Sequence, residues 1–208
     1  MLTVHHLGSS QSERIVWLCE ELDIPYELVR YDRDPVTRLA PAAYKALHLS
    51  GTAPIITDGG LTLAESGAVI DYIVAKHGDG RLKLHADHPD FARFLYWYHF
   101  ANGSLMPSLM VLMDGGGGAI AGIMRDRAVR YLDALEAYFA DGHLWLAGTD
   151  FTIADIMIMF PLTGMRAFIP VDLSSYSNLS AYLRRVVNRP AFRSAMAKAE
   201  PNLEIRAD

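Results

Sequence analysis

Residues 54–73, with the sequence PIITDGGLTLAESGAVIDYI, contain the clearest signal of the fold. Two short apolar runs, 54–57 and 61–64, flank Asp58-Gly59-Gly60, which is typical of a hairpin turn. Proline can open the first run because a strand's first residue need not donate a ladder hydrogen bond. The apolar spacing then changes to that of a helix over residues 65–76. The stretch predicts a β-hairpin followed directly by a helix.

Upstream of this stretch the chain alternates between strand and helix patterns. Residues 2–7 and 26–30 are strand-like, and Ile15, Leu18, Cys19 and Leu22 form a helical stripe between them. A less regular helical pattern covers residues 36–47. The order is therefore β-α-β-α-β-β-α, which predicts a small α/β sheet domain covered by helices over residues 1–78.

Downstream the strand pattern disappears. Residues 79–89 are polar and contain glycine, so we interpret them as a linker. The remaining chain predicts an all-α domain over residues 90–208. Its expected helices cover residues 90–113, 119–140, 152–168, 178–188 and 190–199. Between the first two, Asp114 and Gly115–Gly118 are either a flexible connection or a mobile rim of a binding site.

Composition narrows the functional classes. The chain has 208 residues, of which 51% are hydrophobic and 21% charged, as in ordinary globular proteins. A net charge of −5 argues against a broad nucleic-acid-binding surface. Its 1 cysteine excludes an internal disulfide and a cysteine-based zinc site. We expect a reducing, cytoplasmic location, with no membrane span, no targeting segment and no metal.

Gly8–Arg14, GSSQSER, joins the first predicted strand to the first predicted helix. Ligands of α/β sheets commonly bind where a strand's carboxyl end faces a helix N-terminus. Ser10 and Glu13 also have the S-x-x-E spacing of a capping box, so Ser10 is either a plain helix cap or a hydroxyl directed at an anionic ligand.

Two further segments point to a peptide-like ligand. An ordinary trans bond before Pro54 is the simplest expectation, whereas a cis bond would expose the backbone N–H and C=O of Ala53. Ser66 follows the second hairpin strand and could cap the next helix or help to bind a carboxylate. Glu65 beside it could bind an ammonium group. A carboxylate and an ammonium together describe an amino acid.

In this order the motifs resemble those of the cytosolic glutathione transferases. The resemblance rests on Ala53-Pro54-Ile55-Ile56 and on Glu65–Ile73, ESGAVIDYI, in the first domain. In the second domain, Trp97–Pro107, WYHFANGSLMP, looks like the fourth-helix motif of a bacterial and fungal subgroup, and Phe151–Asp155 looks like the family's N-capping box. The resemblance covers nearly the whole chain and implies a thioredoxin-like domain followed by an all-α domain.

The resemblance also implies roles for single residues. Ser10 matches the catalytic serine of serine-type members, four residues before Arg14, with Ser9 and Ser12 as rivals. Ala53 matches the residue whose backbone pairs with glutathione, and Pro54 matches the cis-proline. Glu65 and Ser66 match the clamp for the γ-glutamyl group. Thr52, also placed in the glutathione site, stands where many members carry Lys or Gln.

The implied reaction is attack of the glutathione thiolate on a small, largely apolar electrophile, with glutathione as cosubstrate, in a homodimeric detoxification enzyme. The electrophile pocket is expected on the all-α domain, from Asn102, Met106, Leu109, Met110 and Phe168, although these side chains also suit an interhelical core. The alternatives are another glutathione-dependent enzyme (peroxidase, disulfide reductase, dehalogenase or isomerase) or a non-catalytic interaction module on the same scaffold.

Five other residues have structural interpretations. Thr152 and Asp155 are expected to cap a helix that is apolar all round and therefore buried. Cys19 is expected in the core because it belongs to the apolar stripe. His5 and His6, neighbours in a strand, must point to opposite faces and cannot form a metal pair.

Overall fold

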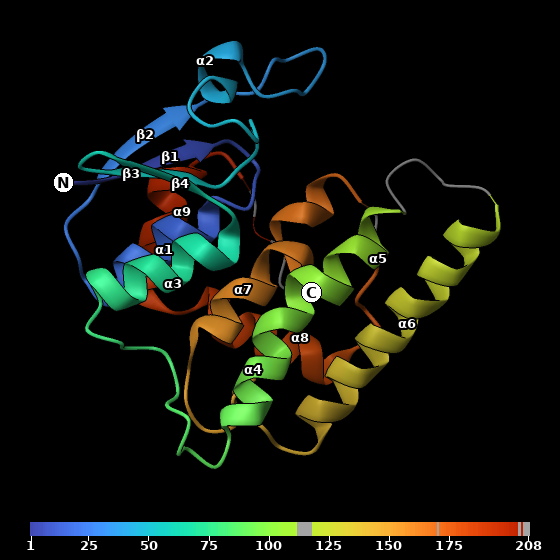
Figure 1. Cartoon of the computed structure of the whole chain (residues 1–208). Coiled ribbons are helices and arrows are strands. Elements are labelled where there is room, and N and C mark those ends of the chain that lie inside the picture. The colour runs from blue at the N-terminus through green and yellow to red at the C-terminus, as the bar shows by residue number, and fades with distance from the viewer. Residues whose placement is uncertain (112–117, 170, 204, 206–208) are drawn as a thin grey trace. The chain divides into compact units, whose positions relative to one another are not determined.

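The computed structural model describes residues 1–111, 118–169, 171–203 and 205 (Figure 1). Contacts between Cα atoms divide the chain into two units. The sheet unit is Met1–Arg81 together with a segment that starts at Arg189. The helical unit is Leu82–Asn188. The predicted fold class, an α/β domain followed by an all-α domain, is confirmed.

The sheet unit is built on four strands: β1 (Leu2–Leu7), β2 (Glu27–Tyr31), β3 (Ile55–Asp58) and β4 (Leu61–Ala64). Their order in the sheet is β2-β1-β3-β4. β1 runs parallel to β2 and antiparallel to β3, and β3 and β4 form the predicted hairpin. Gly59 in the turn has φ +59°, a conformation that glycine adopts without steric cost.

Helices cover both faces of this sheet (Figure 1). On one face lie α1 (Glu13–Leu22), α3 (Ser66–Lys76) and α9 (Pro190–Ala199), and α2 (Ala42–Lys45) lies on the other. Tyr44 of α2 is fully buried and shares a hydrophobic cluster with Leu7, Ile55 and Ala64.

α2 is shorter than the helix predicted over residues 36–47. The Asp34 carboxylate accepts the backbone N–H groups of Val36 and Thr37, at 3.0 and 2.7 Å, which closes a local turn. Arg38 then has φ +61°, outside the helical region. The helix begins only after Pro41 because residues before it form this turn instead of a helix.

α9 belongs to the sheet unit by its contacts, whereas residues 90–208 were expected to form one all-α domain. Phe192 packs edge-on against Trp17 of α1, with the ring centres 5.0 Å apart. Arg189 pairs with Glu21 at 2.7 Å, and Lys198 pairs with Glu20 at 2.6 Å. Helical periodicity locates such a helix but does not reveal which unit its apolar face covers.

The helical unit contains α4 (Phe91–Phe100), α5 (Met106–Met110), α6 (Ala119–Ala140), α7 (Ile153–Leu162) and α8 (Ser177–Val187). A π-helical turn, Ala101–Leu105, separates α4 from α5 inside the helix predicted over residues 90–113. The helix predicted over residues 152–168 ends earlier, at Leu162, and continues as the 3₁₀ turn Gly164–Ala167. The glycine segment 115–117 and Asp114 lie outside the described residues.

α7 starts with a complete capping box. The Thr152 hydroxyl accepts the Ala154 N–H at 3.3 Å, and the Asp155 carboxylate accepts the Thr152 N–H at 2.9 Å. All residues of α7 are buried, as its apolar sequence predicts. Asp155 also accepts hydrogen bonds from the Leu146 N–H and the Tyr182 hydroxyl, at 3.0 and 2.9 Å. The carboxylate therefore connects three segments of the helical unit by hydrogen bonds.

Over the described residues, every helix is too short or too polar to cross a membrane.

Candidate functional site

Strand pairing brings three predicted segments to one edge of the sheet. β1 ends at Leu7, β3 begins at Ile55 and β4 ends at Ala64. His5 of β1 is paired with Ile55, and Ile55 with Ala64, so these strand ends are neighbours. The loop after β1, residues 52–54 and the start of α3 consequently meet at this edge, which is where the sequence places a ligand.

The serines of the β1–α1 loop differ in their surroundings. The Ser10 side chain is 4% exposed, and its hydroxyl donates to the Leu7 carbonyl oxygen at 2.6 Å. The Oγ atoms of Ser10 and Ser12 lie 2.7 Å apart, and Ser12 is fully buried. Ser9 is half-buried, and among the described residues its hydroxyl makes no hydrogen bond. Its backbone has φ +52°, in the left-handed region.

The capping box expected from Ser10 and Glu13 is not formed. The first helical residue is Glu13, so Ser12 occupies the N-cap position, and its side chain makes no capping bond. Glu13 is buried instead of reaching back to the chain, and its Oε2 atom has no hydrogen-bond partner within the described parts of the structure. Burial, with the nearby Glu200 charge, raises the pKa of Glu13 to about 8, against the effect of Arg14.

The Ala53–Pro54 peptide bond is cis, in place of the trans bond that X-Pro frequencies alone favour. Pro54 is buried, Ala53 is half-buried and Thr52 is exposed. The three residues thus run from solvent into the sheet at the start of β3.

At the start of α3, Glu65 occupies the N-cap position with an exposed side chain and φ +81°. Ser66 is the first helical residue and does not cap the helix as a plain cap would. Its buried hydroxyl donates to Gln11 Oε1 at 3.1 Å. Arg14 Nη1 also donates to Gln11 Oε1, at 2.6 Å, and lies 3.4 Å from Ser66 Oγ. The β1–α1 loop and the α3 N-terminus are therefore directly connected.

Several residues beneath the site were missed by sequence reasoning. Arg33 donates to the carbonyl oxygens of Gly8 and Ser9, at 2.7 and 3.3 Å. Glu200 binds the ring of His6 at 3.0 Å and accepts the backbone N–H of Ser9. Arg33 and Glu200 are far from the loop in sequence and belong to no motif. The strand periodicity predicts which face of the sheet His6 lies on, but not that Glu200 binds its ring.

Cys19 is buried in α1, and burial raises the pKa of its thiol. This environment disfavours the thiolate, which is the reactive form of cysteine. Among the described residues no group of three or more His, Cys, Asp or Glu side chains is arranged to hold a metal ion.

The electrophile-pocket candidates of the helical unit do not share one environment. Leu109 is in the core at 1% exposure, whereas Met110 is 50% exposed. Asn102, Met106 and Phe168 are half-buried. The π turn widens the helix between Asn102 and Met106, so the α-helical spacing used for the prediction does not hold across it.

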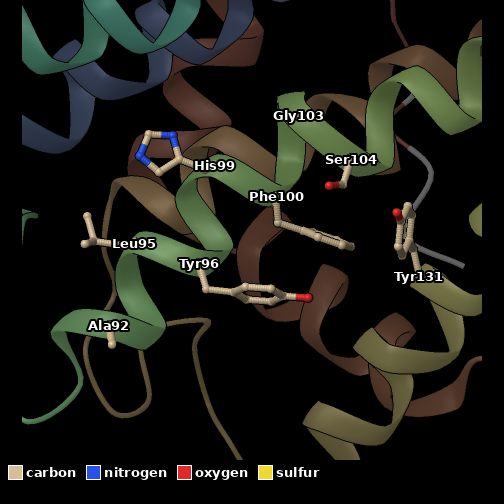
Figure 2. A pocket seen from close by; sticks show the side chains of 8 residues that line it. All are labelled: Ala92, Leu95, Tyr96, His99, Phe100, Gly103, Ser104 and Tyr131. Atoms are coloured by element: carbon tan, nitrogen blue, oxygen red, sulfur yellow. The ribbon is translucent and has the colours of Figure 1, made fainter.

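A separate hollow of about 620 Å³ lies on the helical unit (Figure 2). Tyr96 and Phe100 of α4 and Tyr131 of α6 are its aromatic lining. The Phe100 ring lies 5.6 Å from that of Tyr96 and 5.1 Å from that of Tyr131, centre to centre. None of the five predicted electrophile-pocket residues lines this hollow.

Two family models match the chain. Residues 8–76 match the glutathione S-transferase N-terminal domain, and residues 121–190 match the glutathione S-transferase C-terminal domain. A crystal structure of a glutathione S-transferase from Actinobacillus pleuropneumoniae superposes with a TM-score of 0.87 at 31% identity, covering 96% of this chain and 93% of that one.

Curated relatives agree over nearly the full length. Glutathione S-transferase 3 of Schizosaccharomyces pombe is 32% identical, over 97% of this chain and 89% of its own. A disulfide-bond oxidoreductase of Escherichia coli, YfcG, is 25% identical, over 96% of both chains.

Proposed function

Because the chain belongs to the glutathione S-transferase family, we propose that it activates the thiol of glutathione for attack on a small, largely apolar electrophile. The observation that carries the proposal is the meeting of the β1–α1 loop, the Ala53–Pro54 segment and the start of α3 at one sheet edge. Each of these segments supplies one kind of group that a tripeptide thiol needs.

The γ-glutamyl group of glutathione would bind at the start of α3. Backbone N–H groups at a helix N-terminus attract a carboxylate, and the exposed Glu65 carboxylate would accept the ammonium group. Ser66 connects this point to the β1–α1 loop through Gln11. The backbone of Ala53 would pair with the cysteinyl residue, beside the cis bond, and Thr52 is the exposed neighbour on the side of the glycine carboxylate.

Ser10 is the residue that we assign to the thiol. A free thiol has a pKa near 8.5, and lowering it by two units takes about 2.7 kcal/mol. A hydrogen bond to a charged group contributes about 1.5–3 kcal/mol and a helix N-terminus about 0.3–1 kcal/mol. The Ser10 hydroxyl would supply the hydrogen bond once it turns from Leu7 to the sulfur, and the N-terminus of α1, which begins at Glu13, would supply the helix effect. Ser9, which is half-buried, and the fully buried Ser12 are the rivals.

The electrophile would contact Asn102, Met106 and Phe168, the half-buried members of the predicted set. Methionine adapts to varied apolar shapes, which suits a permissive site. Met110, being exposed, is a further candidate, whereas Leu109 supports the core.

Reduction of disulfides is the second candidate reaction. It is favoured by the likeness to the Escherichia coli disulfide-bond oxidoreductase. The same thiolate would attack a sulfur atom instead of a carbon atom, so the two reactions differ only in the second substrate.

We also propose a homodimer in the cytoplasm. α4 and α6 expose apolar side chains, among them Tyr96 at 56%, Ile123 at 52% and Val129 at 48%. A second copy covering this surface and the hollow of Figure 2 would remove them from water. Sedimentation velocity tests this proposal. We expect a dimer for the native chain and a monomer for Tyr96→Glu.

A two-step experiment tests the function. Retention on immobilised glutathione is measured first, and failure to bind would favour an interaction module without a glutathione site. Turnover with glutathione is then measured against halogenated aromatics, epoxides, hydroperoxides and mixed disulfides. We expect turnover of at least one electrophile class, and glutathione binding with no turnover on the whole panel would contradict the proposal.

A further inference from the structure

A buried hydrogen-bond chain runs beneath the β1–α1 loop. Glu200 Oε1 lies 3.0 Å from His6 Nε2, and His6 Nδ1 lies 2.9 Å from Ser12 Oγ. Ser12 Oγ in turn lies 2.7 Å from Ser10 Oγ. Four side chains from β1, the loop and the segment after α9 thus connect a carboxylate to the serine that we assign to the thiol.

The whole chain is withdrawn from water. His6 and Ser12 are 0% exposed, Ser10 is 4% and Glu200 is 9%. A buried polar chain of this kind is costly unless each group is hydrogen-bonded, and here each one is. Proton exchange with bulk water is correspondingly restricted along it.

The hydrogen-bond directions follow from the carboxylate. A neutral His6 donates its Nε2 hydrogen to Glu200, so Nδ1 accepts the hydrogen of the Ser12 hydroxyl. The Ser12 oxygen is then available as acceptor for the Ser10 hydroxyl, which otherwise donates to the Leu7 carbonyl. In this arrangement each side-chain hydroxyl or ring N–H donates to the next group on the way to Glu200.

We propose that this chain is a proton relay that moves the proton of the bound glutathione thiol to His6. The proposal rests on thiol activation at Ser10. The thiol S–H bond breaks as its proton binds Ser10 Oγ, the Ser10 proton moves to Ser12 Oγ, and the Ser12 proton moves to His6 Nδ1. Each hydroxyl gains one proton and loses one, and the products are a thiolate and an imidazolium paired with the Glu200 carboxylate. The Ser10 hydroxyl now donates to the sulfur.

The charges around the relay are compatible with this product state. Glu200 faces the ring directly, and a carboxylate at hydrogen-bond distance stabilises an imidazolium. Glu13, from α1, is the second acid in this region and is neutral at pH 7 because its pKa is raised to about 8. Arg33, from the segment after β2, donates to the Gly8 and Ser9 carbonyl oxygens, and its charge interacts with that of Glu200. His6 and Glu200 act through the serines, so they are positioning residues.

Counting protons tests the relay directly. Thiolate formation on binding glutathione at pH 7 is followed by ultraviolet absorbance, and proton release is measured by calorimetry in buffers of different ionisation enthalpy. For the native chain we expect thiolate with nearly no proton released, because the proton remains on His6. Release of one proton per thiolate would overturn the relay, because the proton would then have gone to water.

Glu200→Gln keeps a hydrogen-bond acceptor for His6 and Ser9 but removes the charge that stabilises the imidazolium. We expect the pKa of the bound thiol to rise by about one unit, which is about tenfold less thiolate at pH 6. The KM for glutathione should stay within about twofold, because Glu200 does not touch the tripeptide. Ser12→Ala interrupts the relay at another point and is expected to show the same shift. Unchanged titration curves in both variants would overturn the proposal.

Two control variants separate the relay from loosening of the fold. Glu20→Gln weakens the tether of α9 to α1 through Lys198 without touching the relay. His5→Gln changes the neighbouring histidine, whose ring bonds Tyr31 and Thr57 instead. Both variants should keep the native proton count and the native pKa of the bound thiol. A rise in that pKa as large as the one expected for Glu200→Gln would contradict the relay. If no thiolate forms in the native chain although glutathione binds, the proposed function itself fails.

Discussion

The N-termini of α1 and α7 carry the same short pattern and use it differently. Ser10-x-x-Glu13 and Thr152-x-x-Asp155 both have the spacing of a capping box. At α7 the box is complete, and the acid also binds Leu146 and Tyr182. At α1 the box is absent, because the Ser10 hydroxyl binds Leu7 and Glu13 is buried with an unbonded oxygen.

Polar groups stabilise the helix at one terminus and belong to the candidate site at the other. The α7 box satisfies backbone donors that would otherwise be buried without partners, so it contributes to the stability of the helical unit. The α1 terminus leaves its helix uncapped by side chains and carries a buried acid at a cost in stability. Proteins tolerate such local departures from the rules mainly at functional sites.

The largest expected effect is on the stabilising side of this comparison. Asp155→Ala removes the carboxylate that accepts from the buried Leu146 N–H, the Thr152 N–H and the Tyr182 hydroxyl. We expect a loss of about 4 kcal/mol in the free energy of unfolding, measured by urea denaturation. Asp155→Asn keeps one acceptor oxygen and should lose about half as much. A loss below about 1 kcal/mol for the alanine variant would show that the capping role is minor.

On the functional side, Ser10→Ala removes the hydrogen bond proposed for the thiolate. We expect kcat/KM for conjugation at pH 6.5 to fall by about 100-fold, equivalent to about 2.7 kcal/mol in transition-state stabilisation. Stability should change much less than in Asp155→Ala, because Ser10 does not cap α1. Ser9→Ala is the matched variant. If kcat/KM fell about 100-fold in Ser9→Ala and did not change in Ser10→Ala, the role would belong to Ser9.

The buried acid of α1 predicts a pH effect. The pKa of Glu13 is about 8 in the folded chain and near 4.5 unfolded, so the folded state holds one more proton between these values. Stability from this group is therefore complete below pH 4.5 and is lost as the pH rises through 8. Glu13→Gln should be more stable than the native chain at pH 9, and the difference should shrink to below about 1 kcal/mol at pH 5.

Thermal unfolding at pH 5, 7 and 9 measures this difference. Comparing two chains at each pH isolates Glu13 from Asp155, whose pKa is raised by burial to about 6 in both. A difference between the chains that does not change with pH would contradict an ionisable, buried Glu13.

The smallest expected effect is that of Thr152→Ala. This change removes the hydroxyl that accepts the Ala154 N–H but leaves the Asp155 carboxylate in place. We expect a loss of about 1 kcal/mol. Glutathione affinity should not change, because Thr152 belongs to the helical unit. Altered glutathione binding, measured by calorimetry, would contradict a purely structural role for Thr152.

The sequence was sufficient where local chemistry decides the structure. The hairpin at Asp58-Gly59-Gly60 and the buried α7 follow from turn residues and apolar spacing. So does the capping box at Thr152, because its partners are three residues apart. The same spacing at Ser10 does not give a capping box, because the Ser10 hydroxyl donates to a backbone carbonyl oxygen of the preceding strand.

The rest depends on contacts between segments distant in sequence. Nothing local to His6 indicates that Glu200, 194 positions later, would bind it. The π turn at Ala101–Leu105 has no pattern in the sequence and changes the register on which Asn102 and Met106 were chosen. Placement of α9 against α1 depends on pairs such as Trp17 and Phe192 that periodicity does not identify.

Ultraviolet titration of glutathione bound to the native chain and to Ser10→Ala measures whether the α1 terminus ionises a bound thiol through Ser10. We expect a bound-thiol pKa about two units below the free value near 8.5 in the native chain, and a value close to the free one in Ser10→Ala. Superimposable titration curves for the two chains would contradict it.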